Sequence, residues 1–170
     1  MTSSLLDDAF AHHAWATLRL VDACSTLSAE QLASDVPAGF GSILGTLQHI
    51  VDSDRFDLAV LAGTSLPGGE AQEMSLEQLR AGMEANARGW AEYLATAPDP
   101  AMMVREVDPD DGYQRDAPVG MRLAYALYHG EEHRSQVCSG LTTLGLEPPS
   151  IDVFDFGLEQ GVVVEVYPQA

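Results

Sequence analysis

Apolar residues recur at steps of three and four along four long stretches of the chain, at about residues 4–27, 42–62, 76–96 and 118–144. This period places them on one face of an α-helix. Each stretch of roughly twenty residues would form a helix about 30 Å long. Four such helices, each with an apolar face, predict an all-α four-helix bundle.

The ends of these stretches carry residues that start helices. Ser42 is a good N-cap for the second stretch. Ser75 and Gln78 form a capping box at the start of the third. A further capping box, Ser28 with Gln31, predicts a short helix after the first stretch.

Between and after the helices the chain is rich in turn residues. Val104–Val107, followed by a turn at Pro109–Gly112, predicts a small hairpin before the last helix. The tail, residues 147–170, is acidic and aromatic and ends in the β-prone run Val162–Val166. This run could cover an edge of the bundle or pair with another chain.

The length of 170 residues fits one domain, which we place at residues 1–170 with its core at 4–146. The charge is lopsided, with 26 acidic and 8 basic side chains, no lysine and a net charge of −18. Phosphate-rich partners require clustered basic residues, so we expect neither a nucleic-acid partner nor a membrane partner. No apolar run is long enough to span a membrane.

The N-terminus and the cysteines favour a cytoplasmic protein. Asp7 and Asp8 stand where a secretory leader would be apolar. Cys24 and Cys138 lie in apolar helical stretches, where they are expected to be small buried residues and not a disulfide pair. Free cysteines are typical of a reducing compartment.

Histidines are the candidate metal ligands of this chain. His129 and His133 are four residues apart in the last helix, so both imidazoles project from one side and can reach one divalent ion. His49, in the middle of the second helix, is the candidate third ligand. A three-histidine site leaves coordination positions open, as catalytic zinc sites do. Imidazole suits zinc, nickel, copper and iron alike.

Blander interpretations remain open for each histidine. The His129/His133 pair could lie on a solvated helix face, and His49 could be a core histidine with satisfied hydrogen bonds. His12 and His13 are expected to pack, or to support a ligand, and not to bind the ion themselves.

One sequence motif indicates a different class of enzyme. His129–His133 matches His-x-x-Glu-His, the inverted zinc-peptidase signature, with Glu132 as the general base. Those enzymes take a distant downstream carboxylate as the third ligand, and only 37 residues follow His133. A zinc hydrolase is therefore a remote alternative.

Four segments together resemble a known family over about residues 4–156. They are Phe10–Trp15, Gly41–Ile50, His129–Gln136 and Gly145–Pro149 with the following Asp152. The chain resembles the DinB-like (DinB/YfiT-like) superfamily of metal-dependent enzymes. The resemblance implies a four-helix bundle of the up-down-down-up type, often dimeric.

The resemblance also implies the ligand set His49, His129 and His133. Arg134 and Gln136 match the family's Arg and Gln after the last ligand, whereas Ser135 replaces a usual glycine and Glu132 replaces a common histidine. Neither departure removes a ligand. Glu132 could orient an imidazole or tune the site, so Glu132 and Arg134 are the candidate catalytic residues.

The activities assigned in the family imply a function class. They are thiol-dependent S-transferases or isomerases that use low-molecular-weight thiols such as mycothiol or bacillithiol. For this chain the resemblance implies a divalent ion, zinc or nickel, a thiol cosubstrate, a small-molecule substrate and a homodimer. The competing hypotheses are a non-catalytic, stress-associated metal-binding bundle and a bundle without metal.

The charged residues next to the ligands in sequence could have structural roles instead of catalytic ones. Glu131 is expected on an exposed helix face. Arg134 is expected either at the substrate or in a structural ion pair with Asp52 or Asp54.

Overall fold

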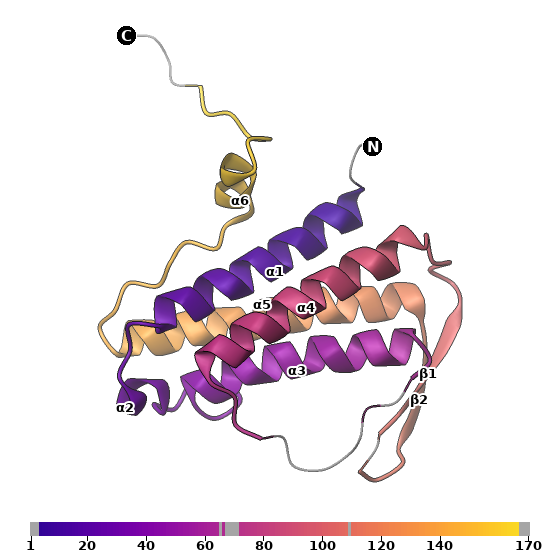
Figure 1. Cartoon of the computed structure of the whole chain (residues 1–170), viewed down its shortest axis with the longest axis horizontal. Coiled ribbons are helices and arrows are strands. Elements are labelled where there is room, and N and C mark those ends of the chain that lie inside the picture. The colour runs from indigo at the N-terminus through magenta and orange to yellow at the C-terminus, as the bar shows by residue number, and fades with distance from the viewer. Residues whose placement is uncertain (1–3, 65, 67–71, 109, 167–170) are drawn as a thin grey trace.

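Four long helices form the body of the protein. The computed structural model describes residues 4–64, 66, 72–108 and 110–166. Helices α1 and α3 each pack against both α4 and α5 (Figure 1). The bounds are α1 Leu5–Cys24, α3 Ile43–Leu61, α4 Leu76–Ala95 and α5 Val119–Thr143. The all-α class is confirmed, and the up-down-down-up order of a four-helix bundle stays a prediction.

The predicted helix starts are the observed ones. The side chains of Ser28 and Ser75 cap the short helix α2 (Ala29–Leu32) and α4, and both capping boxes are complete. The hydroxyl of Ser42 accepts the N–H of Gly45 at the start of α3. These caps satisfy amide groups that the first turn of a helix leaves without a partner.

The core consists of two apolar clusters at different levels of the helices. One holds Leu20, Leu47, Met83 and Val137, and Cys24 lies among them as a free thiol. The other surrounds Trp90 and is completed by the side chains of Phe10, Leu61, Val119, Leu123 and Ala126.

A two-stranded antiparallel hairpin precedes α5, at the position that the sequence predicts. Strand β1 (Met103–Val107) pairs with β2 (Gln114–Pro118). Residue 109, in the predicted turn, lies outside the described residues. The hairpin sits beside the C-terminal end of α3 and the start of α5 (Figure 1).

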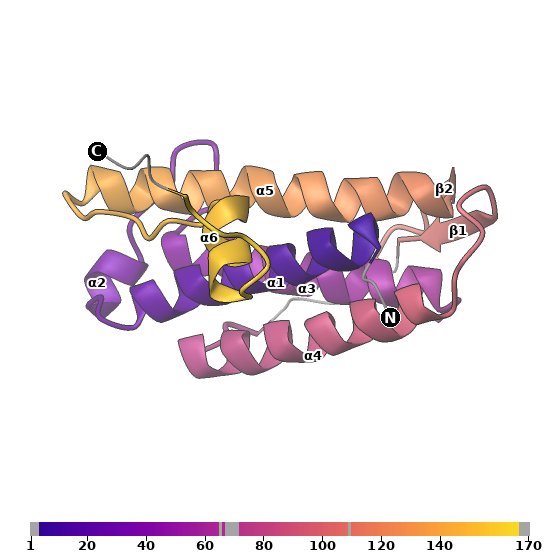
Figure 2. The ribbon, with the colours of Figure 1, turned by 90° about the horizontal axis from the view of Figure 1, so that it is seen from above.

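The tail contains a helix that the sequence interpretation did not predict. Helix α6 (Val153–Glu159) is capped by Asp152 and packs against α1 (Figure 2). The Nε1–H of Trp15 donates to Glu159 at 2.8 Å. The β-prone run Val162–Val166 forms no strand within the described part of the chain.

None of the helices in the described residues is long and apolar enough to cross a membrane.

Candidate metal centre

The three predicted ligand histidines meet between α3 and α5. The Nε2 atom of His129 lies 3.1 Å from Nε2 of His49 and 3.0 Å from Nε2 of His133. One ring nitrogen from each histidine falls within 4.8 Å of the others, a cluster that could hold a metal ion. Ligand nitrogens that bind one zinc ion tetrahedrally at about 2.0–2.1 Å stand about 3.3 Å apart, so the two distances from His129 fit such an ion.

The antiparallel course of α3 and α5 brings these residues together. His49 lies beside His129, whereas Asp57, two turns later in α3, pairs with Arg122, two turns earlier in α5. His129 and His133 are four residues apart, so they share one face of α5.

The rings are held by neighbouring side chains. Nδ1 of His133 lies 2.7 Å from Oε1 of Gln136. Because an amide oxygen only accepts, Nδ1 carries the hydrogen, and Nε2 keeps a free lone pair for an ion. Phe40 stacks on His49, with ring centroids 3.9 Å apart and planes 4° from parallel. Tyr125 stacks on His129 at 5.1 Å.

Two of the ligands are neutral at ordinary pH. Burial lowers the pKa of His49 to about 4, and His133 acts in the same direction. Burial, with His133 and His49 beside it, also lowers the pKa of His129 to about 4, although the charges of Asp54 and Glu132 act to raise it. Neutral imidazole is the form that binds a metal. The donor set, its orientation and its protonation state therefore all fit a divalent ion.

Directly beside the ligands, a buried polar network joins three helices. Nε2 of His13 in α1 lies 2.9 Å from Oδ2 of Asp54 in α3, and Nδ1 of the same ring lies 2.8 Å from Nη1 of Arg134 in α5. Nη2 of Arg134 also donates to Glu131 at 2.8 Å. All but Glu131 are buried.

This network corrects the expected partner of Arg134. The sequence interpretation placed Arg134 either at the substrate or in a direct ion pair with Asp52 or Asp54. The direct pair is wrong, because His13 stands between Arg134 and Asp54. Asp52 pairs instead with Arg55 at 3.0 Å. The i, i+3 and i, i+4 spacings that a sequence reveals cannot show a bridge from another helix.

The other candidate residues lie as follows. Glu131 and Glu132 are exposed on α5, as was expected for Glu131. Arg134 is 2% exposed, and its guanidinium contacts α1 and Glu131. The cluster's third histidine is His49 and not the downstream carboxylate that the peptidase motif requires.

A second buried ion-pair network lies at the hairpin end. Nη1 of Arg122 lies 3.4 Å from Oδ1 of Asp57, and Nη2 contacts Glu106 of β1. Burial raises the pKa of Asp57 to about 7, although Arg122 acts to lower it. No sequence motif marks this pairing, since it joins residues 65 positions apart.

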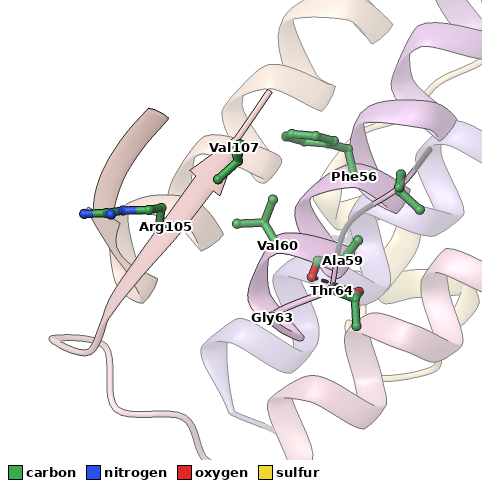
Figure 3. Close-up of a pocket in the computed structure, with 8 residues that line it drawn as sticks. Phe56, Ala59, Val60, Gly63, Thr64, Arg105 and Val107 are labelled. Carbon is green, nitrogen blue, oxygen red and sulfur yellow. Dashed lines mark hydrogen bonds between the residues drawn. The ribbon is translucent and has the colours of Figure 1, made fainter. Parts of the chain in front are cut away.

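A separate cavity of about 220 Å³ opens between α3 and β1. Its walls include Phe56, Val60, Thr64 and Val107 (Figure 3). Phe56 and Val60 are seven and eleven residues after His49, on the same face of α3. None of the three clustered histidines lines this cavity.

Fold and site together define an all-α protein with a three-histidine candidate metal centre between two antiparallel helices. The family model described as the DinB family matches residues 1–161. The chain therefore belongs to the DinB family. None of the curated proteins compared with the chain matches it.

Proposed function

We propose that this protein binds one divalent metal ion through His49, His129 and His133 and uses it in thiol chemistry, as a metal-dependent S-transferase or isomerase. The observation that supports the proposal is the clustering of three imidazoles, with Nε2 of His129 at 3.1 Å from that of His49 and 3.0 Å from that of His133, and with two of the rings neutral at pH 7. Membership of the DinB family supports the same reading.

We propose zinc or nickel as the metal, because both bind imidazole readily. A divalent ion bound there would supply Lewis-acid chemistry that lowers the pKa of a thiol or a water molecule. Three protein ligands leave coordination positions open for a small-molecule substrate or a low-molecular-weight thiol.

The chain's own residues divide the remaining work. We propose Glu132, which is exposed one residue before His133, as the group that accepts the proton released by the thiol. Gln136 fixes the ring of His133. Arg134 is turned into the core, so we assign it a positioning role and not contact with substrate.

Metal analysis tests the proposal first. Protein purified without chelator or affinity tag is expected to carry about one divalent ion per chain, and His129→Ala is expected to lose it. Glu84→Gln, on the exposed surface of α4, serves as the matched control. The proposal would be overturned if the protein carried no bound metal and took up neither added zinc nor added nickel.

Thiol-transfer assays on the metal-loaded protein then separate the enzyme from a non-catalytic metal-binding protein. Glu132→Gln is expected to retain the ion and lose turnover. A metal-loaded wild type without turnover, across mycothiol- and bacillithiol-type thiols, would favour the non-catalytic alternative.

A further inference from the structure

Two partly exposed aromatic side chains lie against ligand rings of the candidate metal centre. Phe40 stacks on His49, with ring centroids 3.9 Å apart, and Tyr125 stacks on His129 at 5.1 Å with planes 22° from parallel. Phe40 is 59% exposed and Tyr125 is 47% exposed. Phe40 comes from the loop before α3 and Tyr125 from α5, so two separate elements each bring an aromatic ring to the site.

The loop that carries Phe40 is held by hydrogen bonds on both sides of this residue. The N–H of Val36 donates to the carbonyl oxygen of Gly41 at 2.8 Å, and the N–H of Gly39 donates to that of Val36 at 2.9 Å. The N–H of Phe40 itself donates to Oγ1 of Thr46 in α3 at 3.1 Å. These bonds fix the backbone just before, at and just after Phe40.

The same loop is strained and closely packed. Ala38 has a φ of 59°, a left-handed conformation that residues with a side chain rarely adopt. A Cβ atom at Gly39 would stand 2.7 Å from Cγ1 of Val36, and one at Gly45 would stand 2.9 Å from the carbonyl oxygen of Phe40. Backbone strain persists only where the surrounding structure enforces it, and it is typical of ligand sites. The loop therefore holds Phe40 in one place although much of its ring faces solvent.

Support of the ligand rings does not account for this exposure. Among the described residues, Phe40 has no ring contact other than His49, and Tyr125 has none other than His129. A single exposed apolar side chain on a surface needs no explanation. Two aromatic rings, each stacked on a ligand and each still open to solvent, instead form an apolar border to the metal centre.

The chemistry of this border indicates what occupies the open coordination positions. Aromatic rings attract other flat apolar groups by stacking and edge contacts. A carboxylate or phosphate finds no basic partner in these two rings, and the nearby Glu132 and the net charge of −18 disfavour an anion. A cationic group would be repelled by a divalent ion beside it. An uncharged aromatic group is the chemistry that remains.

We propose that Phe40 and Tyr125 contact the substrate of the metal centre and select a small molecule that carries an uncharged aromatic ring next to its metal-binding group. This inference rests on the proposed metal binding by His49, His129 and His133. It names the two residues that determine specificity and the class of molecule that they favour.

Thiol binding to the cobalt-loaded full chain, followed by absorption, tests the inference. The probes are phenylmethanethiol and cyclohexylmethanethiol, which have the same number of carbon atoms and differ in the flatness of the ring. A thiolate that enters the coordination sphere changes the cobalt spectrum. The two thiols differ intrinsically as ligands, and this difference is the same in every variant. The measured quantity is therefore the ratio of the two affinities, compared between wild type and variant at saturating cobalt.

The variants separate an aromatic contact from packing. Phe40→Leu and Tyr125→Leu are each expected to lower the preference for phenylmethanethiol by about three- to tenfold, the contribution of one aromatic pair. Phe40→Tyr keeps a ring and is expected to retain the preference within about twofold. Phe154→Leu, at an exposed aromatic of α6, is the matched control and is expected to leave the ratio unchanged.

The outcomes are distinct. A wild type that takes up no cobalt overturns the metal centre, and this inference with it. A wild type that takes up cobalt but binds neither thiol keeps the metal centre and overturns the thiol function together with this inference. If both thiols bind, an unchanged ratio in both leucine variants overturns this inference alone. An equal loss of affinity for the two thiols also overturns it, because the rings would then only support the ligands. If Tyr125→Leu does not fold, Phe40→Leu and its rescue by Phe40→Tyr decide.

Discussion

Two buried charge networks in the described part of the chain are built differently. Beside the histidines, Arg134 reaches Asp54 through His13 by contacts of 2.8 and 2.9 Å. At the hairpin end, Arg122 faces Asp57 directly but at 3.4 Å. The first network has short bonds at every link, whereas in the second Arg122 contacts Glu106 closely and Asp57 only at the longer distance.

The side chains at the two ends of the bundle also differ in how burial shifts their pKa values. Burial raises the pKa of Asp57 to about 7 because its distant partner does not offset the loss of water. At the other end, burial lowers the pKa of His49 and His129 to about 4. At Asp57, the nearby buried cation therefore does not offset the effect of burial on the carboxyl pKa.

Replacing each of the two arginines in turn is expected to give the largest difference in the free energy of unfolding. Arg134→Leu leaves Nδ1 of His13 without its donor and the buried His13–Asp54 pair without its neighbouring cation, so we expect the free energy of unfolding to fall by about 3–5 kcal/mol. Arg122→Leu is expected to cost less, because Asp57 can take up a proton and become neutral. Urea unfolding at pH 7 measures both losses. Equal losses in the two variants would contradict the prediction that the networks differ.

Asp57 predicts a pH dependence of its own. Its pKa is about 7 in the folded chain and 3.8 in an ordinary carboxyl group. Between these values the folded chain holds a proton that the unfolded chain has released, so this group removes stability as the pH rises from about 4 to 7. Asp57→Asn is expected to gain stability relative to wild type over that window.

Unfolding of metal-free protein at several pH values measures this difference. The histidines act in the opposite sense, since His49 and His129 remove stability as the pH falls from 6.5 towards 4. Their contribution is present in both proteins and cancels in the comparison. A constant difference between Asp57→Asn and wild type from pH 4 to 7 would contradict the prediction.

Substitutions of two glycines on α5, one near each network, are expected to have smaller effects on stability. Gly130→Ala brings a Cβ atom to 2.2 Å from the His13 ring, and overpacking of this kind costs about 1–3 kcal/mol. Gly120→Ala meets Pro100 at 3.3 Å, which a small shift relieves. Thermal unfolding is expected to show a clear loss for the first and little change for the second; the reverse order would show that the His13 site adapts.

The smallest effect is expected at Phe40. Phe40→Leu removes the ring stacked on His49 at 3.9 Å, and aromatic pairs contribute about 0.5–1.5 kcal/mol. Phe154→Leu, at another exposed aromatic, is the control. We expect zinc affinity to fall by less than about tenfold in the first and to stay constant in the second, measured by chelator competition.

Local patterns predicted much of the fold. Helical periodicity and capping boxes placed the long helices, and the Asp-Pro-Asp-Asp-Gly turn placed the hairpin. Helix α6 was missed because it is only seven residues long, too short to show a period, and is held by Trp15 and Arg19 of α1 through Glu159. The N-cap Asp152 was the available signal.

The ligand histidines were predictable for a similar reason. The spacing of His129 and His133 within one helix indicated two ligands. The position of His49 in the middle of another helix made it the candidate third ligand, and the family resemblance implied the same set. The networks around them join residues 41, 65 and 121 positions apart, and no local rule relates such distant positions. The stacking of Phe40 on His49 was also missed, whereas the stacking of Tyr125 on His129 is an i, i+4 contact that helical spacing could have shown.

The missing side chain at Gly130 has a consequence for the history of the family. A Cβ atom at position 130 would stand 2.2 Å from the ring of His13, so a larger residue there is destabilising unless position 13 becomes smaller. Among relatives, an imidazole at the position of His13 should occur only with glycine at that of Gly130, whereas lineages with a larger residue there should carry a smaller one in the first helix. Paired substitution at these two sites would thus record where the hydrogen-bonded network of Arg134, His13 and Asp54 was gained or lost.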